Sequence, residues 1–349
     1  MEAVKQKQRV VVICPGRGTY NKEELGYLKR LHADKVELVS LIDDYRQAKD
    51  QIPVSQLDAM DKYSMRQHTA GENASALIYA CAMADFLDIN KDEYDVVAVT
   101  GNSMGWYIAL AVAGALSPDG AIEVINTMGS MMTDGVIGGQ IIYPITNEDW
   151  QEDTTLVANI ERWMDEVNTV DENQVYLSIQ LGGYIVFGGN DKGLKALEER
   201  LPPLQERYPM RLFNHAAFHT PLLVDIASKA QQQLSPSLFQ KPEIPLIDGL
   251  GQIWQPYSCD TSKLFSYTLG TQVVEPYNFT QAVNVAIKEF APDKLIILGP
   301  GSTLGGATGQ CLVQNNWLGM QNKQDFIDRQ KKQPFVLAMG IAEQRVAVV

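Results

Sequence analysis

Residues 94–116 read YDVVAVTGNSMGWYIALAVAGAL and place a serine between two apolar segments of different character. The segment 94–100 is rich in β-branched residues, which predicts a buried strand, whereas the small apolar residues of 106–116 predict a helix. The turn between them, GNSMG, has a GxSxG pattern centred on Ser103. Strand, tight turn and helix in this order are the setting in which such a serine is exposed as a nucleophile.

The sequence of this turn predicts both its tight backbone conformation and a catalytic role. A side chain at Gly101 or Gly105 is expected to collide with the neighbouring strand or helix, so both positions need glycine. The N–H of Met104 lies at the start of the following helix, where the positive end of the helix dipole favours a developing oxyanion. The alternative is a helix start rich in Gly and Ser with no chemistry, but both flanks fit the nucleophile elbow.

Outward from this centre, strands and helices alternate. The run RVVVIC at 9–14 ends in the turn PGRG and predicts a second buried strand, and KLIILG at 294–299 predicts another. Helical spacing occurs at 22–32 and at 72–88, whereas 33–66 is polar and gives no clear assignment. Alternation of this kind favours an α/β fold with an open, mostly parallel sheet.

The pattern changes from about Asp134. A predicted strand at 136–146 is followed by a helix at 154–168 and by a hairpin of 176–180 with 184–189. A helix broken at Pro202-Pro203 and a short strand at 210–214 complete this segment. This order predicts a small α+β unit inserted between Met132 and His215, after which the first pattern resumes.

Composition narrows the class of protein. The 349 residues include 29 Lys and Arg against 42 Asp and Glu, a formal charge of −13. Such an acidic chain is not expected to bind nucleic acid or anionic membranes in general. The four cysteines are far apart, and neither they nor the four histidines have the spacing of a metal site, so no metal is expected. Without a signal peptide or an apolar span of membrane length, the expected location is the cytoplasm.

A nucleophilic serine needs a base, and the sequence offers few. His219 stands in the segment AFHTP just before a predicted helix, and His215 stands four residues earlier. The remaining histidines, His32 and His68, lie in a charged helix and a polar loop. From the residues alone His219 and His215 rank about equally as the base.

Six ordered segments resemble motifs of the malonyl-CoA:acyl-carrier-protein transacylase family, which includes the acyltransferase domains of fatty-acid and polyketide synthases. Each segment alone is a weak indication of the family, but together the six span residues 10 to about 310. The segments are CPGRGT at 14–19, similar to FPGQGS; GNSMGWY at 101–107 with AGALS at 113–117, similar to GHSLGEY and AGALS; the strand 183–189; FHTPL at 218–222, similar to PFHSPLM; Gln272 with Pro276 and Phe279, similar to Q…NPVxW; and LGPG at 298–301, similar to EVGPG.

The resemblance implies a large α/β-hydrolase-like domain that carries a small ferredoxin-like domain, with the site in the cleft between them. The large domain is assigned to 1–133 and 215–349, and the small one to 134–214. This arrangement agrees with the inserted α+β unit.

The resemblance also implies the catalytic roles. Ser103 is expected to attack a thioester while His219 takes its proton, with the backbone carbonyl of Gln272 orienting His219. The N–H groups of Met104 and Arg17 are expected to form the oxyanion hole. No permanent cofactor is expected: acyl-CoA is the substrate, and an acyl carrier protein with its phosphopantetheine thiol is the partner. Asp248, in PLIDG, is a weaker candidate to orient His219.

Departures from the family pattern concern the acyl pocket, assigned to Asn102, Trp106, Met128 and Phe218. Malonyl-selective members carry an arginine in the helix after the nucleophile, where it pairs with the free carboxylate of the substrate. Met128 holds this position here, which predicts a preference for an uncharged acyl group. Asn102 and Trp106 replace the family's His and Glu, and Trp106 is expected to narrow the pocket.

The third departure is Arg17, which stands where the family has Gln. Three roles are open for its charge: contact with the phosphates of CoA or of the carrier, pairing with a substrate carboxylate, or exposure to solvent.

Five other basic residues lie close together in the sequence of the inserted unit. Glu198, Glu199 and Glu206 interleave with them, which favours a solvated helix face over a carrier-binding patch. The five are Lys192, Lys195, Arg200, Arg207 and Arg211.

The predicted function is that of a serine-nucleophile acyltransferase that loads a non-malonyl acyl group onto a carrier protein. One alternative is a thioester hydrolase of the same fold that clears stalled acyl groups from carriers. Ordinary malonyl transfer is a second alternative, if Arg17 or another basic residue replaces the missing arginine. A non-catalytic carrier-binding subunit is a third, against which the presence of Ser103 and His219 argues.

Overall fold

A computed structural model of the chain describes residues 6–131 and 135–349. Its larger sheet has six strands in the order β11-β10-β1-β2-β7-β8, and all neighbours are parallel except β7 and β8. In β1 the run Val10–Cys14 is fully buried, as expected for a strand covered on both faces. The strands are β1 (Gln8–Cys14), β2 (Tyr94–Gly101), β7 (Leu246–Ile247), β8 (Ile253–Trp254), β10 (Lys294–Ile297) and β11 (Val336–Ala338).

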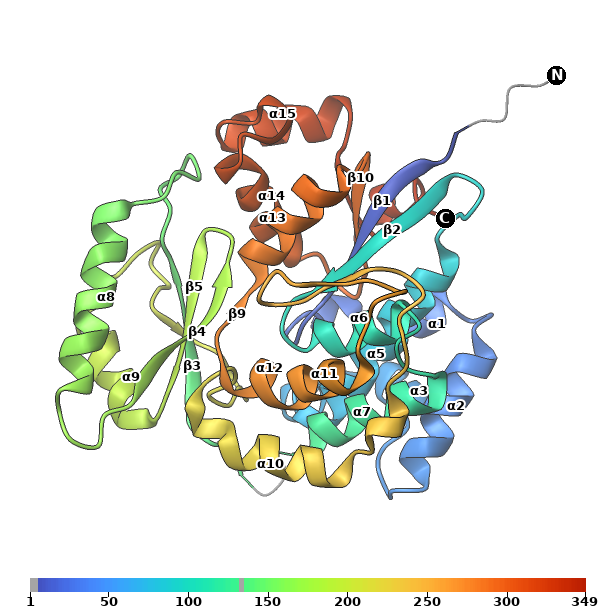
Figure 1. The fold of residues 1–349 in the computed structure, drawn as a ribbon, viewed down its shortest axis with the longest axis horizontal. Coiled ribbons are helices and arrows are strands. Elements are labelled where there is room, and N and C mark those ends of the chain that lie inside the picture. Colours follow the sequence, from blue (N-terminus) through green and yellow to red (C-terminus); the bar gives the residue numbers. More distant parts are fainter. Residues whose placement is uncertain (1–5, 132–134) are drawn as a thin grey trace.

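Helices surround this sheet (Figure 1). The helix of residues 71–88 is rich in alanine and has twelve buried residues, and all eight residues of the helix 105–112 are buried. The helices around the sheet are α1 (Tyr27–Leu31), α2 (Val36–Gln47), α3 (Val54–Asp58), α4 (Met65–His68), α5 (Gly71–Asp88), α6 (Gly105–Val112), α7 (Pro118–Ser130), α10 (Val224–Gln233), α11 (Thr261–Ser266), α12 (Gln272–Val274), α13 (Phe279–Phe290), α14 (Leu304–Gln314), α15 (Lys323–Lys332) and α16 (Ala342–Arg345).

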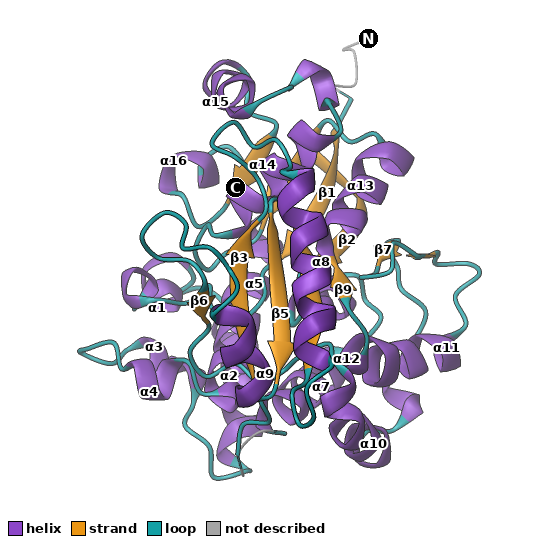
Figure 2. Cartoon of the chain, turned by 90° about the vertical axis from the view of Figure 1, so that its left-hand side faces the viewer, coloured by secondary structure: helices purple, strands orange, loops and turns teal. Residues whose placement is uncertain are grey.

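A second sheet of five strands has the order β6-β3-β5-β4-β9. Its first four strands alternate with two helices in the chain order β-α-β-β-α-β, which is that of ferredoxin-like units. Figure 2 shows α8 lying over this sheet. The elements are β3 (Gly139–Pro144), α8 (Thr154–Asn168), β4 (Val175–Leu181), β5 (Tyr184–Gly189), α9 (Asp191–Glu198), β6 (Met210–Arg211) and β9 (Tyr277–Asn278).

The predicted fold class is confirmed: a large, mostly parallel α/β sheet is accompanied by a smaller α+β unit with a hydrophobic core of its own. The domain limits themselves stay a prediction, and the boundary predicted at 133/134 lies outside the described residues. One strand crosses between the units, because β9 comes from beyond residue 215 and pairs in parallel with β4. Figure 1 shows β9 between the two sheets.

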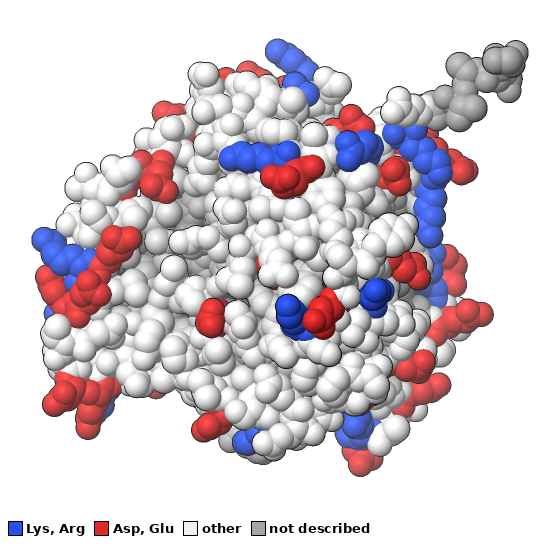
Figure 3. Space-filling view, in the orientation of Figure 1, with Lys and Arg blue, Asp and Glu red and all other residues white. Residues whose placement is uncertain are grey.

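Three of the five clustered basic side chains of the inserted unit are paired with carboxylates. Arg211 bonds to Glu198 and Asp191, Lys192 contacts Glu172, and Arg200 lies 3.8 Å from Glu166. In Figure 3 the side of the molecule that carries α8 and α9 shows blue and red atoms interleaved. These pairs neutralise part of the positive charge on that face. Of the helices that the structure describes, none is long and apolar enough to cross a membrane.

Candidate active site

Ser103 lies at the tip of a sharp turn between β2 and α6. Its φ of 55° is in the left-handed region, which a non-glycine residue occupies only under strain. A Cβ on Gly101 would lie 2.3 Å from the carbonyl oxygen of Gly105, and one on Gly105 would lie 2.3 Å from that of Cys14. Both glycines are therefore required for the close approach of strand, turn and helix, as the sequence predicts.

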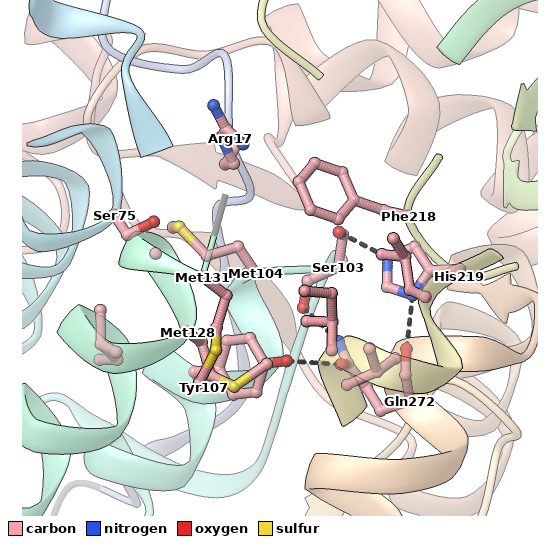
Figure 4. Close-up of a pocket in the computed structure, with 15 residues that line it drawn as sticks. Arg17, Ser75, Ser103, Met104, Tyr107, Met128, Met131, Phe218, His219 and Gln272 are labelled. Atoms are coloured by element: carbon pink, nitrogen blue, oxygen red, sulfur yellow. Dashed lines mark hydrogen bonds between the residues drawn. The ribbon is translucent and has the colours of Figure 1, made fainter. Parts of the chain in front are cut away.

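His219 faces the serine from a loop of the chain more than a hundred residues later. Its Nε2 lies 2.7 Å from Ser103 Oγ, a hydrogen-bond distance (Figure 4). His219 also has a left-handed backbone, with φ of 58°, and its N–H donates to the carbonyl oxygen of Val273 at 3.1 Å. The structure thus brings together the two residues predicted as nucleophile and base.

Gln272 fixes the orientation of both residues. Its carbonyl oxygen lies 2.6 Å from His219 Nδ1, and because a carbonyl only accepts, Nδ1 carries the proton and Nε2 is free to accept one. The Gln272 side chain donates to the carbonyl oxygen of Ser103 at 3.1 Å and accepts from the Tyr107 hydroxyl at 2.7 Å. The contact predicted through the Gln272 carbonyl is present.

A short π-helical turn at Tyr267–Thr271 precedes Gln272. Such turns are rare and occur mostly at functional sites. Trp106 packs against this turn. Its indole N–H donates to the Thr268 hydroxyl at 3.0 Å, and its ring contacts that of Tyr267 edge-to-face. The helix that begins at the nucleophile thereby supports the segment that orients the base.

His219 is neutral at ordinary pH. Its burial lowers its pKa to about 4, and the hydrogen bond to Gln272, which favours the charged form, offsets only part of this effect. A neutral imidazole whose Nε2 faces a hydroxyl can accept the hydroxyl proton. The geometry and the charge state therefore both suit a general base.

The backbone N–H groups of Met104 and Arg17 are the predicted donors of the oxyanion hole. Met104 follows the serine at the start of α6, and Arg17 lies in the turn after β1. Among the described backbone hydrogen bonds, neither N–H has an acceptor. Free N–H donors beside a nucleophile are the usual means of stabilising a tetrahedral oxyanion, so these two predicted donors are available for that role.

The Ser103 and His219 side chains line a small cavity of about 60 Å³. Most of its wall is apolar, from α7, α10 and the loop of His219. Figure 4 shows Arg17 and Met128 at opposite ends of the cavity, with the hydroxyl of Ser103 away from both. The wall comprises Arg17, Ser75, Ser103, Met104, Tyr107, Ile125, Met128, Gly129, Met131, Phe218, His219, Leu223, Ile226, Gln272 and Val273.

Two residues predicted for the acyl pocket do not line it. Trp106 is fully buried behind the turn, so the expectation that it narrows the pocket is wrong. Asn102 is directed toward the first turn, where a Cβ on Gly16 would lie 3.3 Å from its Nδ2. Met128 and Phe218 do line the cavity, as predicted.

Two other candidates have structural partners. His215 Nδ1 lies 2.8 Å from Gln140 Oε1 and does not contact Ser103, which separates it from His219. Asp248 accepts from Trp254 and from the backbone of Leu250 and Gln252, so it holds a turn and does not orient His219. Within residues 6–131 and 135–349 no group of three or more His, Cys, Asp or Glu side chains is placed to hold a metal ion.

Sequence reasoning missed some residues at the site. Tyr107 was predicted as part of a helix and of the GNSMGWY motif but without a role of its own, yet its hydroxyl donates to the Gln272 side chain. Ser75, in the predicted helix 72–88, is 3% exposed and lines the cavity. Its polarity within the mostly apolar run 74–84 is the signal that the sequence offers.

No family model matches the chain. A curated relative, the malonyl CoA-acyl carrier protein transacylase of Bacillus subtilis, is 22% identical over 300 residues, 85% of this chain and 89% of the relative. The structure of a malonyl-CoA:acyl carrier protein transacylase from Xanthomonas oryzae aligns over 98% of both chains with a TM-score of 0.75 and 16% identity. An acyl-carrier-protein S-malonyltransferase from Burkholderia pseudomallei aligns over 97% of this chain and 99% of its own, with a TM-score of 0.75 and 18% identity.

Another similar structure is that of a malonyl-transacylase in complex with a type II polyketide synthase acyl-carrier protein. It aligns over 98% of both chains with a TM-score of 0.72 and 18% identity. The predicted resemblance to the malonyl transacylase family is thereby confirmed, and the fold is that of these proteins.

Proposed function

We propose that this chain is a serine acyltransferase that moves an acyl group from a CoA thioester to the phosphopantetheine thiol of an acyl carrier protein. The observation that carries the proposal is the chain of hydrogen bonds from the Ser103 hydroxyl through His219 to the Gln272 carbonyl. The activities named for the similar proteins, and the carrier protein bound to one of them, support the same donor and acceptor.

The first half-reaction forms an acyl-serine. As Ser103 Oγ attacks the thioester carbonyl, His219 Nε2 accepts the hydroxyl proton, and the Met104 and Arg17 N–H groups donate to the oxyanion. Collapse of the tetrahedral intermediate breaks the C–S bond, and His219 returns the proton to the CoA sulfur.

The second half-reaction reverses these steps with a new thiol. The carrier thiol gives its proton to His219 and attacks the acyl-serine carbonyl, and the serine oxygen leaves with that proton. Water in place of the thiol would give hydrolysis through the same groups, so the acceptor distinguishes a transferase from an editing hydrolase.

The cavity favours a short acyl group. Its volume of about 60 Å³ is less than half of the roughly 150 Å³ that accommodates benzene in an engineered protein cavity. Its apolar wall and Met128 suit an uncharged group, as the sequence predicts, but Arg17 places a cation in the same wall. The charge of the acyl group therefore depends on Arg17.

Intact-protein mass spectrometry tests this function. The wild-type chain, incubated with a panel of short acyl-CoA thioesters, is expected to gain the mass of one acyl group, and Ser103→Ala is expected to gain none. Addition of holo-carrier protein should move the mass to the carrier. An equal mass gain in Ser103→Ala would refute the elbow assignment, rapid loss to water would indicate a hydrolase, and no acylation by any thioester would favour a non-catalytic subunit.

A further inference from the structure

Two polar side chains of the small sheet are buried against the loop that carries His219. Gln140, in β3, is 2% exposed, and Ser178, in β4, is not exposed at all. Neither residue lines the acyl cavity. A polar side chain is costly to bury unless it makes hydrogen bonds, so the partners of these two residues show what they hold in place.

The two side chains form a bridge of hydrogen bonds that leaves the loop and returns to it. His215 Nδ1 lies 2.8 Å from Gln140 Oε1, and the Gln140 amide nitrogen donates to the Ser178 hydroxyl at 2.7 Å. The Ser178 hydroxyl in turn donates to the carbonyl oxygen of Phe218 at 2.7 Å. Because an amide oxygen only accepts, His215 Nδ1 carries the proton, and every donor of this Gln140–Ser178 bridge is directed toward Phe218.

The carbonyl at the end of the bridge belongs to the peptide group that joins Phe218 to His219. The N–H of the same peptide group donates to the carbonyl oxygen of Val273, in α12, at 3.1 Å. One peptide plane is therefore held through its oxygen by the small sheet and through its nitrogen by α12. The orientation of this plane contributes directly to the φ of His219, which at 58° lies in a region that a non-glycine residue occupies only when its surroundings enforce it.

The small sheet is shaped to let this bridge form. Ser178 lies at a register shift between β4 and β5, and such bulges re-aim side chains next to active sites. Gly188 lies opposite Gln140 in β5, the strand between β3 and β4. A Cβ on Gly188 would lie 2.7 Å from Thr220 Cγ2 and 3.4 Å from the Phe218 carbonyl oxygen. Glycine in β5 therefore lets the loop approach the sheet beside the bridge.

We propose that Ser178 is a positioning residue of the active site, whose hydroxyl holds the Phe218–His219 peptide so that the imidazole faces the nucleophile. This inference rests on the proposed acyl transfer through Ser103, and it adds the small sheet to the groups that orient the base. Without the hydroxyl the peptide loses one of its two anchors, and the backbone of His219 can relax from its left-handed conformation. The 2.7 Å contact between His219 Nε2 and Ser103 Oγ then lengthens, and removal of the serine proton becomes slower.

Variants of Ser178 test this inference by mass spectrometry of acylation under single-turnover conditions, with acetyl-CoA or malonyl-CoA, whichever acylates the wild type faster. In Ser178→Ala the rate constant at saturating donor should fall at least about tenfold, while the donor concentration at half saturation changes less than about twofold. Ser178→Thr, which keeps the hydroxyl, should retain more of the rate. An unchanged rate constant in Ser178→Ala, or a change confined to half saturation, would overturn the inference.

Gln140→Met serves if Ser178→Ala does not fold. Methionine has a similar length, but it removes the amide that donates to the Ser178 hydroxyl, so the rate constant should fall at least about threefold. An unchanged rate constant in a folded Gln140→Met would overturn the bridge as a positioning device.

Tyr143→Phe is the matched control for a general loss of stability. Tyr143, also in β3, is fully buried, and its hydroxyl donates to the carbonyl oxygen of Pro202 at 2.6 Å, a contact that does not involve the loop of His219. Like Ser178→Ala, this variant removes one hydrogen bond from a side chain to the backbone, but it should change the acylation rate constant less than about twofold. Equal losses of rate in the two variants would overturn the inference.

A double-mutant cycle separates positioning of the base from other effects on the site. In a His219→Ala background the residual acylation rate should not change when Ser178→Ala is added, because Ser178 acts only through the imidazole. A further loss as large as that in the wild-type background would overturn the inference while leaving the proposed acyl transfer intact. If no thioester acylates wild-type Ser103, the proposed function fails first.

Discussion

His219 illustrates at the scale of one residue how burial can set the charge state of a candidate general base. The hydrogen bond from Nδ1 to the Gln272 carbonyl fixes the tautomer without adding a negative charge, unlike the carboxylate of a serine protease triad. The ion pairs of the described residues do not include His219, so desolvation dominates and the pKa of the imidazole falls to about 4. The base therefore stays neutral over the physiological range.

The pH dependence of acylation follows from this low pKa. Protonated His219 cannot accept the serine proton, so activity should be lost as pH falls through about 4 and should be nearly constant from about pH 6 to 8. The test is kcat/KM for acylation of free enzyme between pH 3.5 and 8, with samples returned to pH 7 to exclude acid unfolding. A midpoint near 6.5, the ordinary value for histidine, would contradict the prediction.

The residues of the site differ in how far the sequence alone predicts their positions and roles. Ser103 is marked by a local pattern, because the turn that exposes it needs glycines on both sides. Gln272 acts on His219 through its backbone carbonyl, which any residue possesses, so only the family resemblance indicated it. Trp106 was misplaced because the sequence of a helix does not show which of its buried faces meets the cavity.

At the scale of elements, a buried ionic cluster joins the C-terminal helix to the core. The Asp85 carboxylate, on α5, is fully buried and contacts Arg345 of α16, the His32 ring at 2.8 Å and the N–H of Gly299 at 2.7 Å. Arg345 also bonds to Asp88 at 2.7 Å. These contacts bring α5, α16 and the turn after β10 together on one carboxylate.

Removal of Arg345 should therefore destabilise the fold. Arg345→Met leaves Asp85 buried without its cation, at an expected cost of about 3 kcal/mol in the free energy of unfolding. Urea denaturation followed by circular dichroism measures the change. Arg162→Met is the matched control, because Arg162 pairs with Glu166 on the exposed face of α8 and should cost less than about 1 kcal/mol. Equal losses in the two variants would contradict the role of the cluster.

Elements were predictable where periodicity was strong. The expected strand at 294–299 and helices at 72–88 and 154–168 correspond to β10, α5 and α8. The polar segment 33–66 gave no assignment but contains α2 and α3, whose stability comes from packing on α5 more than from sequence pattern. The two-residue strand β9 is too short to predict, since its pairing with β4 depends on the tertiary structure.

For the whole molecule, β9 explains how the two sheets meet at one site. Tyr277, in β9, pairs with β4 of the small sheet, and its hydroxyl donates to the carbonyl oxygen of Gly101 in the elbow at 2.6 Å. Its ring also lies 5.4 Å from that of His219. A single residue thus contacts the small sheet, the nucleophile turn and the base, so the relative placement of the sheets and the geometry of the site are linked.

The net charge of the molecule governs its encounter with a carrier. This chain has a formal charge of −13, and three of the five clustered basic residues of its inserted unit are paired with carboxylates. Carrier proteins are usually acidic, so long-range repulsion should slow their approach at low salt. An increase in ionic strength from about 10 mM to about 150 mM shortens the Debye length from roughly 30 Å to roughly 8 Å, which screens this repulsion.

The KM for an acidic holo-carrier protein should therefore fall as salt is added over that range, while the KM for free pantetheine, a neutral thiol acceptor, should not change. Both are measured by the transfer of acyl mass from the acyl-enzyme. A KM for the carrier that rises with salt would mean that attraction to a local cationic surface outweighs the net charge, and the basic side chains outside the inserted unit would then be the place to seek the carrier contact.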